Sequence, residues 1–354
     1  MQELVSIIIP AYNAERWLSE TIRSALNQTW PHKEIIIVDD GSTDNTLTTA
    51  KQFESKIVKV VGQENAGASA ARNKGLSLAQ GGYVQWLDAD DLLAPDKIMT
   101  QLKHADRGNE SRTLFTSSFG TFFFCHQRAK FMPTSLWRDL SPIDWLVNKF
   151  NETVWMNPAV WLVSRKLTEE AGPWNERLIR DNDGEYVCRV VAKSQEVKFV
   201  GEGISYYRVG NFRSLSTSTS DKSCESLLLS LDLCIQCLLT LENTTRTRNA
   251  CVNLLQAWMP FLYPEKEECV RRLRSLAAPL GAHLTDPRST WKYYGIQKLF
   301  GWKVAKKVMT ECRAAKWNCV RGFDKLLFQI SNRSDLLGRL RGLIGPLEAN
   351  GDSL

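Results

Sequence analysis

The sequence lacks the features of a secreted or membrane-spanning chain. Its nine cysteines are few for 354 residues, and no spacing pattern pairs them into a disulfide framework, which favours a reducing compartment. The first residues carry an acid and a short β-branched run, not a basic region followed by a long apolar one, so they predict a strand and not a signal peptide. The most apolar later stretch, residues 227–241, is shorter than the roughly 20 residues of a membrane span. We therefore expect a cytoplasmic chain without a transmembrane helix.

The excess of positive over negative charge is also small, and it is unevenly distributed along the chain. Lys and Arg number 45 against 39 Asp and Glu, a net charge of +6 that is too mild for a dedicated nucleic-acid-binding protein. Residues 1–219 hold 25 basic and 26 acidic side chains, whereas residues 220–354 hold 20 and 13. The positive charge thus belongs to the C-terminal third, and we place a domain boundary between 219 and 220.

The first 110 residues alternate β-branched runs with amphipathic segments. The expected strands are residues 5–9, 34–38, 57–61 and 83–87, and the expected helices are residues 14–28, 44–53 and 68–79. Buried strands alternating with helices predict an α/β fold with a mostly parallel sheet covered by helices on both faces. Residues 114–207 mix aromatic strand-like runs with prolines, and from 220 onward we expect a helical extension.

Acids stand directly after two of the expected strands. In an open parallel sheet the carboxyl ends of the strands form the crevice where ligands bind. The first group is Val38-Asp39-Asp40-Gly41-Ser42-Thr43-Asp44, whose carboxylates could accept hydrogen bonds from the base or ribose of a nucleotide. An ordinary strand-to-helix turn, with Ser42 to Asp44 capping the next helix, is the alternative.

The second group is Trp86-Leu87-Asp88-Ala89-Asp90-Asp91. Alternate residues of an extended chain share a face, so Asp88 and Asp90 would point the same way. Carboxylates this close repel one another unless a cation intervenes, and Mg²⁺ or Mn²⁺ suits oxygen ligands completed by substrate phosphates. The alternative is an acid-capped helix start, since residues 92–102 look helical.

Five motifs in order make the sequence similar to a known family. They are Val5-Ser6-Ile7-Ile8-Ile9-Pro10-Ala11-Tyr12-Asn13, Ile37-Val38-Asp39-Asp40-Gly41-Ser42-Thr43-Asp44, Asn65-Ala66-Gly67, Ala71-Arg72-Asn73-Lys74-Gly75 and Leu87-Asp88-Ala89-Asp90-Asp91. This order closely resembles the family 2 glycosyltransferases of the GT-A fold. The resemblance is strong over residues 4–110 and weaker to about 216. It implies a nucleotide-diphosphate sugar donor, a divalent metal and inversion at the anomeric carbon.

The same resemblance assigns donor-binding roles. It implies that Ala11, Tyr12 and Asp39 hold the nucleobase and that Arg72 lies near the base or the diphosphate. Uridine is only the commonest base of the family.

The second acidic group gains roles in the same way. By the resemblance, Asp88 faces the ribose and Asp90 binds the Mn²⁺ or Mg²⁺ that bridges the two phosphates. The chemistry agrees, because a leaving diphosphate accumulates negative charge that a dication and an arginine stabilise.

An inverting transfer also needs a base that takes the proton of the acceptor hydroxyl. The family usually supplies it from a Glu-Asp pair before a helix that ends in an Arg. Counting back from Arg189 puts Asn182-Asp183 on this pair, which implies Asp183 as the base. Because Asn182 replaces the usual Glu, Asp181 stays open as the alternative.

A further departure follows Tyr206-Tyr207-Arg208. Many relatives have a metal-reaching His there, but Val209-Gly210-Asn211 offers none. Asn211 or water could complete the coordination, or the segment is a loop over the donor. The Gln-x-x-Arg-Trp motif of processive relatives is also missing, so we expect one sugar per encounter.

The C-terminal third interleaves aromatics with its basic residues. Eight aromatic side chains lie between residues 291 and 328: Trp291, Tyr293, Tyr294, Phe300, Trp302, Trp317, Phe323 and Phe328. They predict either helices that bind an anionic membrane surface, which would suit a lipid-linked acceptor, or helices that pack onto the catalytic domain.

The sequence-based hypothesis is an inverting, metal-dependent glycosyltransferase that uses a nucleotide-diphosphate sugar. Its acceptor would be a glycan or a lipid-linked oligosaccharide in surface polysaccharide synthesis. Trp155, Trp161 and Trp174 could stack on sugar rings or belong to the core. The alternative is a non-catalytic member that binds a nucleotide or a partner glycosyltransferase. Four acids at strand or helix ends, Asp39, Asp88, Asp90 and Asp183, argue against this alternative.

Overall fold

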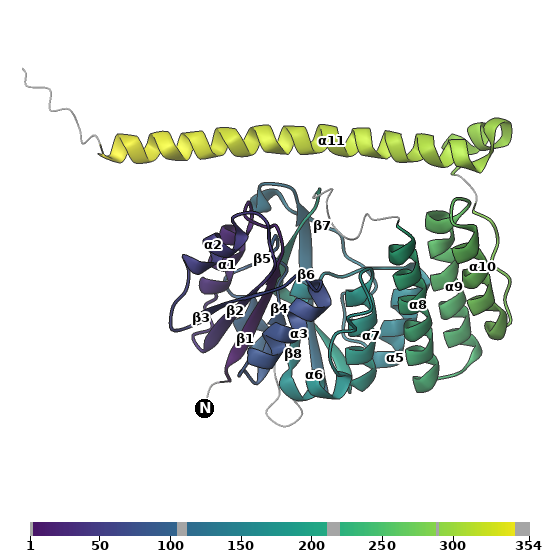
Figure 1. Ribbon diagram of the computed structural model, residues 1–354, viewed down its shortest axis with the longest axis horizontal. Coiled ribbons are helices and arrows are strands. Elements are labelled where there is room, and N and C mark those ends of the chain that lie inside the picture. Colours follow the sequence, from purple (N-terminus) through teal and green to yellow (C-terminus); the bar gives the residue numbers. More distant parts are fainter. Residues whose placement is uncertain (1–2, 105–111, 211–219, 288–289, 344–354) are drawn as a thin grey trace, which may run out of the picture.

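The fold is of the α/β class: a central β-sheet has helices on both faces, and a long helix lies across one edge (Figure 1). The computed structural model describes residues 3–104, 112–210, 220–287 and 290–343, with side chains up to residue 330.

The N-terminal half builds the parallel part of the sheet, as predicted. Strands β1 (Val5–Ala11), β2 (Lys33–Asp40), β3 (Val58–Gln63) and β4 (Tyr83–Trp86) lie in the order β3-β2-β1-β4. The register pairs Val5 with Lys33 and Ala11 with Asp39. The residues that follow β1 and β2 therefore start from the same level at one edge of the sheet.

The second half of the sheet is mixed. Strands β8 (Leu162–Ser164), β6 (Thr113–Phe122), β9 (Glu196–Arg208) and β5 (Leu92–Leu93) continue from β4, while β7 (Lys130–Phe131) pairs with β6. Only the β6–β9 pair is parallel among these described pairings. The prediction of a helix over residues 92–102 was wrong for its first residues. Leu92 and Leu93 form a short strand against β9, and helix α4 begins at Lys97 (Lys97–Lys103).

Alternate residues of β1 bury into opposite faces of the sheet. Ile7 and Ile9 join the apolar cluster with helix α1 (Leu18–Leu26), whereas Ile8 joins the cluster on the other face. Helix α3 (Ala68–Leu78) packs against β1 and β2. Short helices complete the layers: α2 (Thr46–Lys51), α5 (Pro142–Glu152), α6 (Arg165–Ala171) and α7 (Asn182–Lys193).

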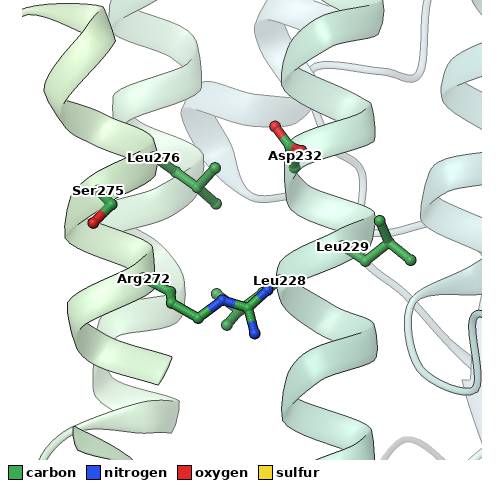
Figure 2. A pocket seen from close by; sticks show the side chains of 6 residues that line it. All are labelled: Leu228, Leu229, Asp232, Arg272, Ser275 and Leu276. Atoms are coloured by element: carbon green, nitrogen blue, oxygen red, sulfur yellow. The ribbon is translucent and has the colours of Figure 1, made fainter. Parts of the chain in front are cut away.

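Three helices of the C-terminal third extend this layer. Helices α8 (Asp221–Leu241), α9 (Thr245–Leu262) and α10 (Glu267–Ala277) share one apolar cluster with α5 and α7. Packing is thus continuous across position 219, and the boundary placed there stays a prediction. Between α8 and α10 lies a pocket of about 210 Å³, into which Arg272 extends toward Leu228 (Figure 2).

Helix α8 corrects one expectation from the sequence. It runs for 21 residues and, among the described helices, is the one long and apolar enough to cross a membrane. The stretch is therefore not too short for a span. Half of its most apolar window is buried, and Leu227, Leu231 and Leu238 lie in the shared cluster.

The last helix, α11 (Tyr294–Leu343), bends at Gly301, where φ is 77°. It lies across the side of the molecule opposite the N-terminus (Figure 1). Every residue from 311 to 320 is exposed, although the Trp317 ring touches Phe123 at 5.5 Å between centroids. The helix is held to the body mainly near Lys306 and near Asp324.

Candidate active site

The turns after β1 and β2 are tied together by short polar side chains. The Asn13 side-chain oxygen accepts from the Thr43 amide at 2.8 Å, and the Ala14 amide donates to Thr46 at 2.7 Å. Asn13 takes a φ of 48°, in the left-handed region that asparagine tolerates. These bonds place Tyr12, which is 52% exposed, beside the end of β2.

Asp39 occupies the end of β2 with one oxygen available. It is 3% exposed, and its Oδ2 accepts from the Ser42 amide at 3.2 Å. Its Oδ1 is buried without a hydrogen-bond partner in the described structure. A buried unsatisfied oxygen costs about 1–3 kcal/mol, so this atom fits a site that receives a donor group from a ligand. Ala11, its partner in β1, is 2% exposed and presents only backbone and a methyl group.

Asp40 has a structural role. The sequence alone did not show whether Asp40, like Asp39, could bind a ligand. Its Oδ1 accepts from Gln63 and the Ala66 amide at 2.7 and 2.9 Å, and its Oδ2 from the Gly67 amide at 2.8 Å. Gly67 directly precedes α3. Asp40 therefore fixes the start of the helix that carries Arg72.

Arg72 reaches the second acidic group. Its Nη2 lies 2.7 Å from Asp88 Oδ1, and its guanidinium lies 4.3 Å from the centre of the Trp174 ring. The Nε and Nη1 atoms are buried and without partners. An arginine with two unused donors, held against a carboxylate, can bind a phosphate or base oxygen.

The segment from Asp88 to Asp91 is anchored by Arg208, a residue that sequence reasoning did not single out. Arg208 Nε donates to the Asp90 main-chain oxygen at 2.8 Å, and its amide donates to Asp91 Oδ1 at 2.9 Å. The other guanidinium nitrogens donate to the Phe123 oxygen at 3.0 Å and Glu20 Oε2 at 2.6 Å. Pairing of β9 with β6 sets Arg208 opposite Phe122, and the Arg208 guanidinium lies over the rings of Trp17 and Phe122, 4.1 and 4.4 Å from their centres.

Asp91 supports the site but lies outside the binding surface. It is fully buried and accepts from Asn157 at 3.1 Å. Burial raises the pKa of Asp91 well above its usual value, and the charges of Asp90 and Asp88 raise it further. Asp91 therefore keeps its proton to a higher pH than an exposed aspartate does.

Asp183 stands in the first turn of α7 and faces aromatic side chains. Its Oδ2 accepts from Trp155 Nε1 at 3.3 Å, and the Trp155 ring lies 4.5 Å from the ring centre of Tyr207. Burial raises the pKa of Tyr207, and the charges of Asp91, Asp90, Asp88 and Asp183 add to this effect. Trp155 thus lies between Asp183 of α7 and Tyr207 of β9.

Asp181, the alternative base, is turned away from this group. Its Oδ2 accepts from Ser230 of α8 at 2.7 Å. Burial raises its pKa to about 6, while the Lys149 charge opposes the shift. Asn182, in place of the usual Glu, donates to Ser69 of α3 at 3.1 Å. The geometry therefore favours Asp183 over Asp181.

The acids fit a metal that is shared with a substrate. Among the described residues no three His, Cys, Asp or Glu side chains are grouped as a ready-made metal site. Mg²⁺ typically takes one or two protein carboxylates plus substrate phosphates, and Asp88 and Asp90, in the segment after β4, are the two carboxylates that would hold it. Asn211, the other proposed ligand, lies outside the described residues.

The three tryptophans that could stack on sugars differ in their exposure to solvent. Trp161 and Trp174 are 2% and 1% exposed, so they are core residues. Trp174 stacks on Tyr186 with ring centres 4.0 Å apart. Trp155 is 40% exposed, and it is the one that contacts Asp183.

Comparisons with known proteins match this chain to glycosyltransferases. The family described as "Glycosyl transferase family 2" matches residues 6–153. Glycosyltransferase GlyG of Streptococcus pneumoniae is 32% identical over 220 residues, which are 59% of this chain and 71% of GlyG. The putative teichuronic acid biosynthesis glycosyltransferase TuaG of Bacillus subtilis is 48% identical over 103 residues, which are 28% of this chain and 41% of TuaG.

A solved structure extends the likeness beyond the matched motifs. The crystal structure of S. aureus TarS 1–349 has a TM-score of 0.60 and 18% identity, and the match covers 78% of this chain and 80% of that one. At this identity the likeness shows the fold. With the motifs, the acids and the GlyG match in place, the chain belongs to glycosyltransferase family 2 and is a glycosyltransferase.

Proposed function

We propose that this glycosyltransferase moves a sugar from a nucleotide-diphosphate sugar, with uridine as the base, to a glycan or lipid-linked acceptor. The transfer inverts the anomeric carbon, is assisted by Mn²⁺ or Mg²⁺ and adds one sugar per encounter. The observation that carries the proposal is the pair of Arg72 and Asp88, 2.7 Å apart, in which the Nε and Nη1 atoms of Arg72 are buried and without partners in the described part of the chain. Asp183 and Tyr207 both contact Trp155, which supports Asp183 as the candidate base.

The donor would bind along the ends of β1, β2 and β4. The partnerless Oδ1 of Asp39 suits a ring N–H of the nucleobase, with Ala11 and Tyr12 beside it. The unused Nε and Nη1 donors of Arg72 suit oxygens of the base or diphosphate. TarS has been solved in complex with UDP and with UDP-GlcNAc, at TM-scores of 0.54 and 0.56 and 17% identity. These complexes support uridine as the first base to test.

Asp90 would hold the metal, with Asp88 toward the ribose. When bound, the cation supplies positive charge against the leaving diphosphate. Arg208 holds the Asp90 main chain from behind and so keeps the carboxylate directed at the donor. Arg72 adds a fixed positive charge next to Asp88.

Asp183 would act as the general base. Its carboxylate takes the proton of the acceptor hydroxyl while that oxygen attacks the anomeric carbon. The bond from this carbon to the phosphate oxygen breaks on the opposite face, and its electron pair leaves with the nucleoside diphosphate. Trp155 positions Asp183 through its N–H, and its exposed ring is suited to stacking on the acceptor sugar.

A relative and the charge distribution support the proposed acceptor class. TuaG is named for teichuronic acid biosynthesis, which supports a surface polysaccharide as the product here. A lipid-linked acceptor would lie at a membrane, and the net charge of +7 on residues 220–354, from 20 basic and 13 acidic residues, supports peripheral contact with an anionic one.

The test is hydrolysis of UDP-sugars in the presence of Mn²⁺, with water as the acceptor. Proton NMR of the sugar first released from an α-linked donor should show the β anomer, and Asp183→Asn should lose this release while still binding UDP. Release of the α anomer would contradict inversion. Binding of UDP without any turnover, with UDP-sugars and added acceptors alike, would favour a non-catalytic member of the family.

A further inference from the structure

The described part of α11 carries an apolar stripe that is largely exposed. Its members are Val304, Val308, Cys312, Ala315, Cys319, Phe323, Leu326 and Ile330. The large side chains are well exposed, with Phe323 at 59%, Leu326 at 53% and Ile330 at 55%. Exposed apolar area of this extent marks an interaction surface more often than a chance arrangement.

Hydrogen bonds with the body come from another side of the same helix. Trp302 donates to the Tyr263 oxygen, and Lys306 donates to the same oxygen and to Glu265. Further along, the Asp324 carboxylate accepts from the Phe124 amide at 3.0 Å. Trp302, Lys306 and Asp324 are separated by multiples of about 3.6 residues and so share a face, which is not the face of the stripe.

The second anchor is aromatic as well as polar. Trp317 and Phe328 lie against Phe123 and Phe124, with ring centres 5.5 and 6.1 Å apart. Trp302, Trp317 and Phe328 of this segment pack on the catalytic body. Phe323 is mostly exposed, but the centre of its ring lies 5.6 Å from the Arg128 guanidinium of the body, and Phe300 is exposed at 66%.

The spacing of the stripe differs from that of a coiled coil. Its residues follow one another at steps of three or four with a mean of about 3.7, close to the 3.6 of a straight helix. From Val304 to Ile330 the stripe drifts by about 80° around the helix, in the sense opposite to the drift of a coiled-coil stripe. A left-handed pair of helices calls for a mean step of 3.5, so the pattern is unlike that of a two-stranded coiled coil.

Positive charge surrounds the stripe. Six basic side chains of α11 are exposed: Lys298, Lys303, Lys307, Arg313, Lys316 and Lys325. Among described side chains of the helix, Glu311 is the exposed acid, since Asp324 is buried against the Phe124 turn. A second copy of this helix would meet like charge, whereas anionic lipid headgroups would neutralise it while the apolar side chains enter the acyl boundary.

We propose that α11 docks on an anionic bilayer through this stripe, with the sheet edge that holds the donor-site acids on the side toward the membrane. This inference makes the proposed membrane contact more specific, and its biological use rests on the proposed function. The donor chemistry does not depend on it.

The experiment is co-sedimentation of the full chain with two kinds of vesicle, pure phosphatidylcholine and phosphatidylcholine mixed with phosphatidylglycerol. We expect binding to the mixed vesicles only. The triple variant Lys307→Gln, Lys316→Gln and Lys325→Gln should bind roughly 100-fold more weakly. Phe323→Gln with Leu326→Gln should also lose binding, because the apolar contribution falls with buried area.

A matched control removes the same charge elsewhere. Lys51→Gln, Lys56→Gln and Lys59→Gln change three exposed lysines far along the chain from α11 and should bind as the wild type does. Calorimetric binding of UDP with Mn²⁺ checks that each variant is folded, and it keeps a failure of membrane docking separate from a failure of the donor site.

Three results would overturn the proposal. One is equal binding to both kinds of vesicle, and another is equal loss in the control variant. The third is a wild type that binds neither vesicle but sediments in analytical ultracentrifugation as a dimer that the Phe323→Gln, Leu326→Gln variant breaks. That result would assign the stripe to a second copy of the chain.

Discussion

Replacing Arg208 with lysine should weaken metal-assisted nucleotide binding while the fold persists. The Arg208 guanidinium joins three acceptors, the main-chain oxygens of Asp90 and Phe123 and the Glu20 carboxylate. A lysine keeps the charge but has a single nitrogen on a flexible stem, so it cannot span all three. We expect the lysine variant to lose the set of guanidinium hydrogen bonds that holds the Asp90 main chain in place.

The magnitude follows from these contacts. A hydrogen bond to a charged group contributes about 1.5–3 kcal/mol. The Glu20 side chain is 40% exposed, so that pair is screened and contributes about 1 kcal/mol or less. A lysine that keeps one carbonyl bond therefore loses about 2–4 kcal/mol in total. If half of this loss falls on the position of Asp90, UDP affinity in the presence of Mn²⁺ drops about 10-fold.

The assay is calorimetric titration with UDP, with and without Mn²⁺. Binding without metal should change little, because Asp39 and Arg72 keep their contacts. A matched control is Arg165→Lys, since Arg165 also bridges two main-chain oxygens, those of Gly81 and Ala79, each at 2.8 Å. Those contacts precede β4, at the opposite end of the strand from Asp90. The control should lower the unfolding temperature similarly but leave UDP affinity intact.

The reasoning would be refuted by either of two results. The first is an Arg208→Lys variant that binds UDP with Mn²⁺ as tightly as the wild type. The second is an Arg165→Lys variant that weakens this binding to the same extent, because the effect would then reflect general loss of stability.

Three further changes probe other parts of the site. Asp183→Asn should lower turnover by about 10²–10⁴-fold with UDP affinity unchanged, and unchanged turnover in steady-state assays would remove Asp183 as the base. Burial raises the pKa of Asp181 to about 6, so the stability it contributes is complete below pH 4 and is lost as the pH rises through 6. Asp181→Asn should therefore raise the unfolding temperature at pH 8 relative to wild type and not at pH 4, and an equal change at both would contradict the shift. Asp40→Asn turns an amide group toward the Ala66 or Gly67 N–H, so it should cost about 1–3 kcal/mol and speed hydrogen exchange of those two amides, whereas unchanged exchange would show that Asp40 does not hold this turn.

Local sequence pattern was enough to predict that three of the candidate site acids lie at strand ends, while their roles stay a proposal. Asp39, Asp88 and Asp90 follow β-branched runs whose alternation with helices implies parallel strands, and such strands end at one edge. Local pattern could not reveal Arg208 as an anchor. Its partners Asp90 and Phe123 lie 118 and 85 residues away, and long-range pairing decides whether an arginine is exposed or buried.

The remaining differences have the same origin. Leu92 and Leu93 look like the start of a helix, but pairing with β9 makes them a strand. The sequence does not distinguish Trp174 from Trp155. In the structure Trp174 is buried in a stack with Tyr186, whereas Trp155 stays exposed. Asp181 and Asp183 could be told apart only because Ser230 of α8 binds the first of them.

The most direct test of the account is titration of the purified chain with UDP, GDP and dTDP, each with and without Mn²⁺. The account predicts that UDP binds, that Mn²⁺ strengthens this binding and that Asp90→Ala removes the gain from Mn²⁺ while Asp183→Asn keeps it. Absence of binding to all three nucleotides, or a gain from Mn²⁺ that survives in Asp90→Ala, would contradict it.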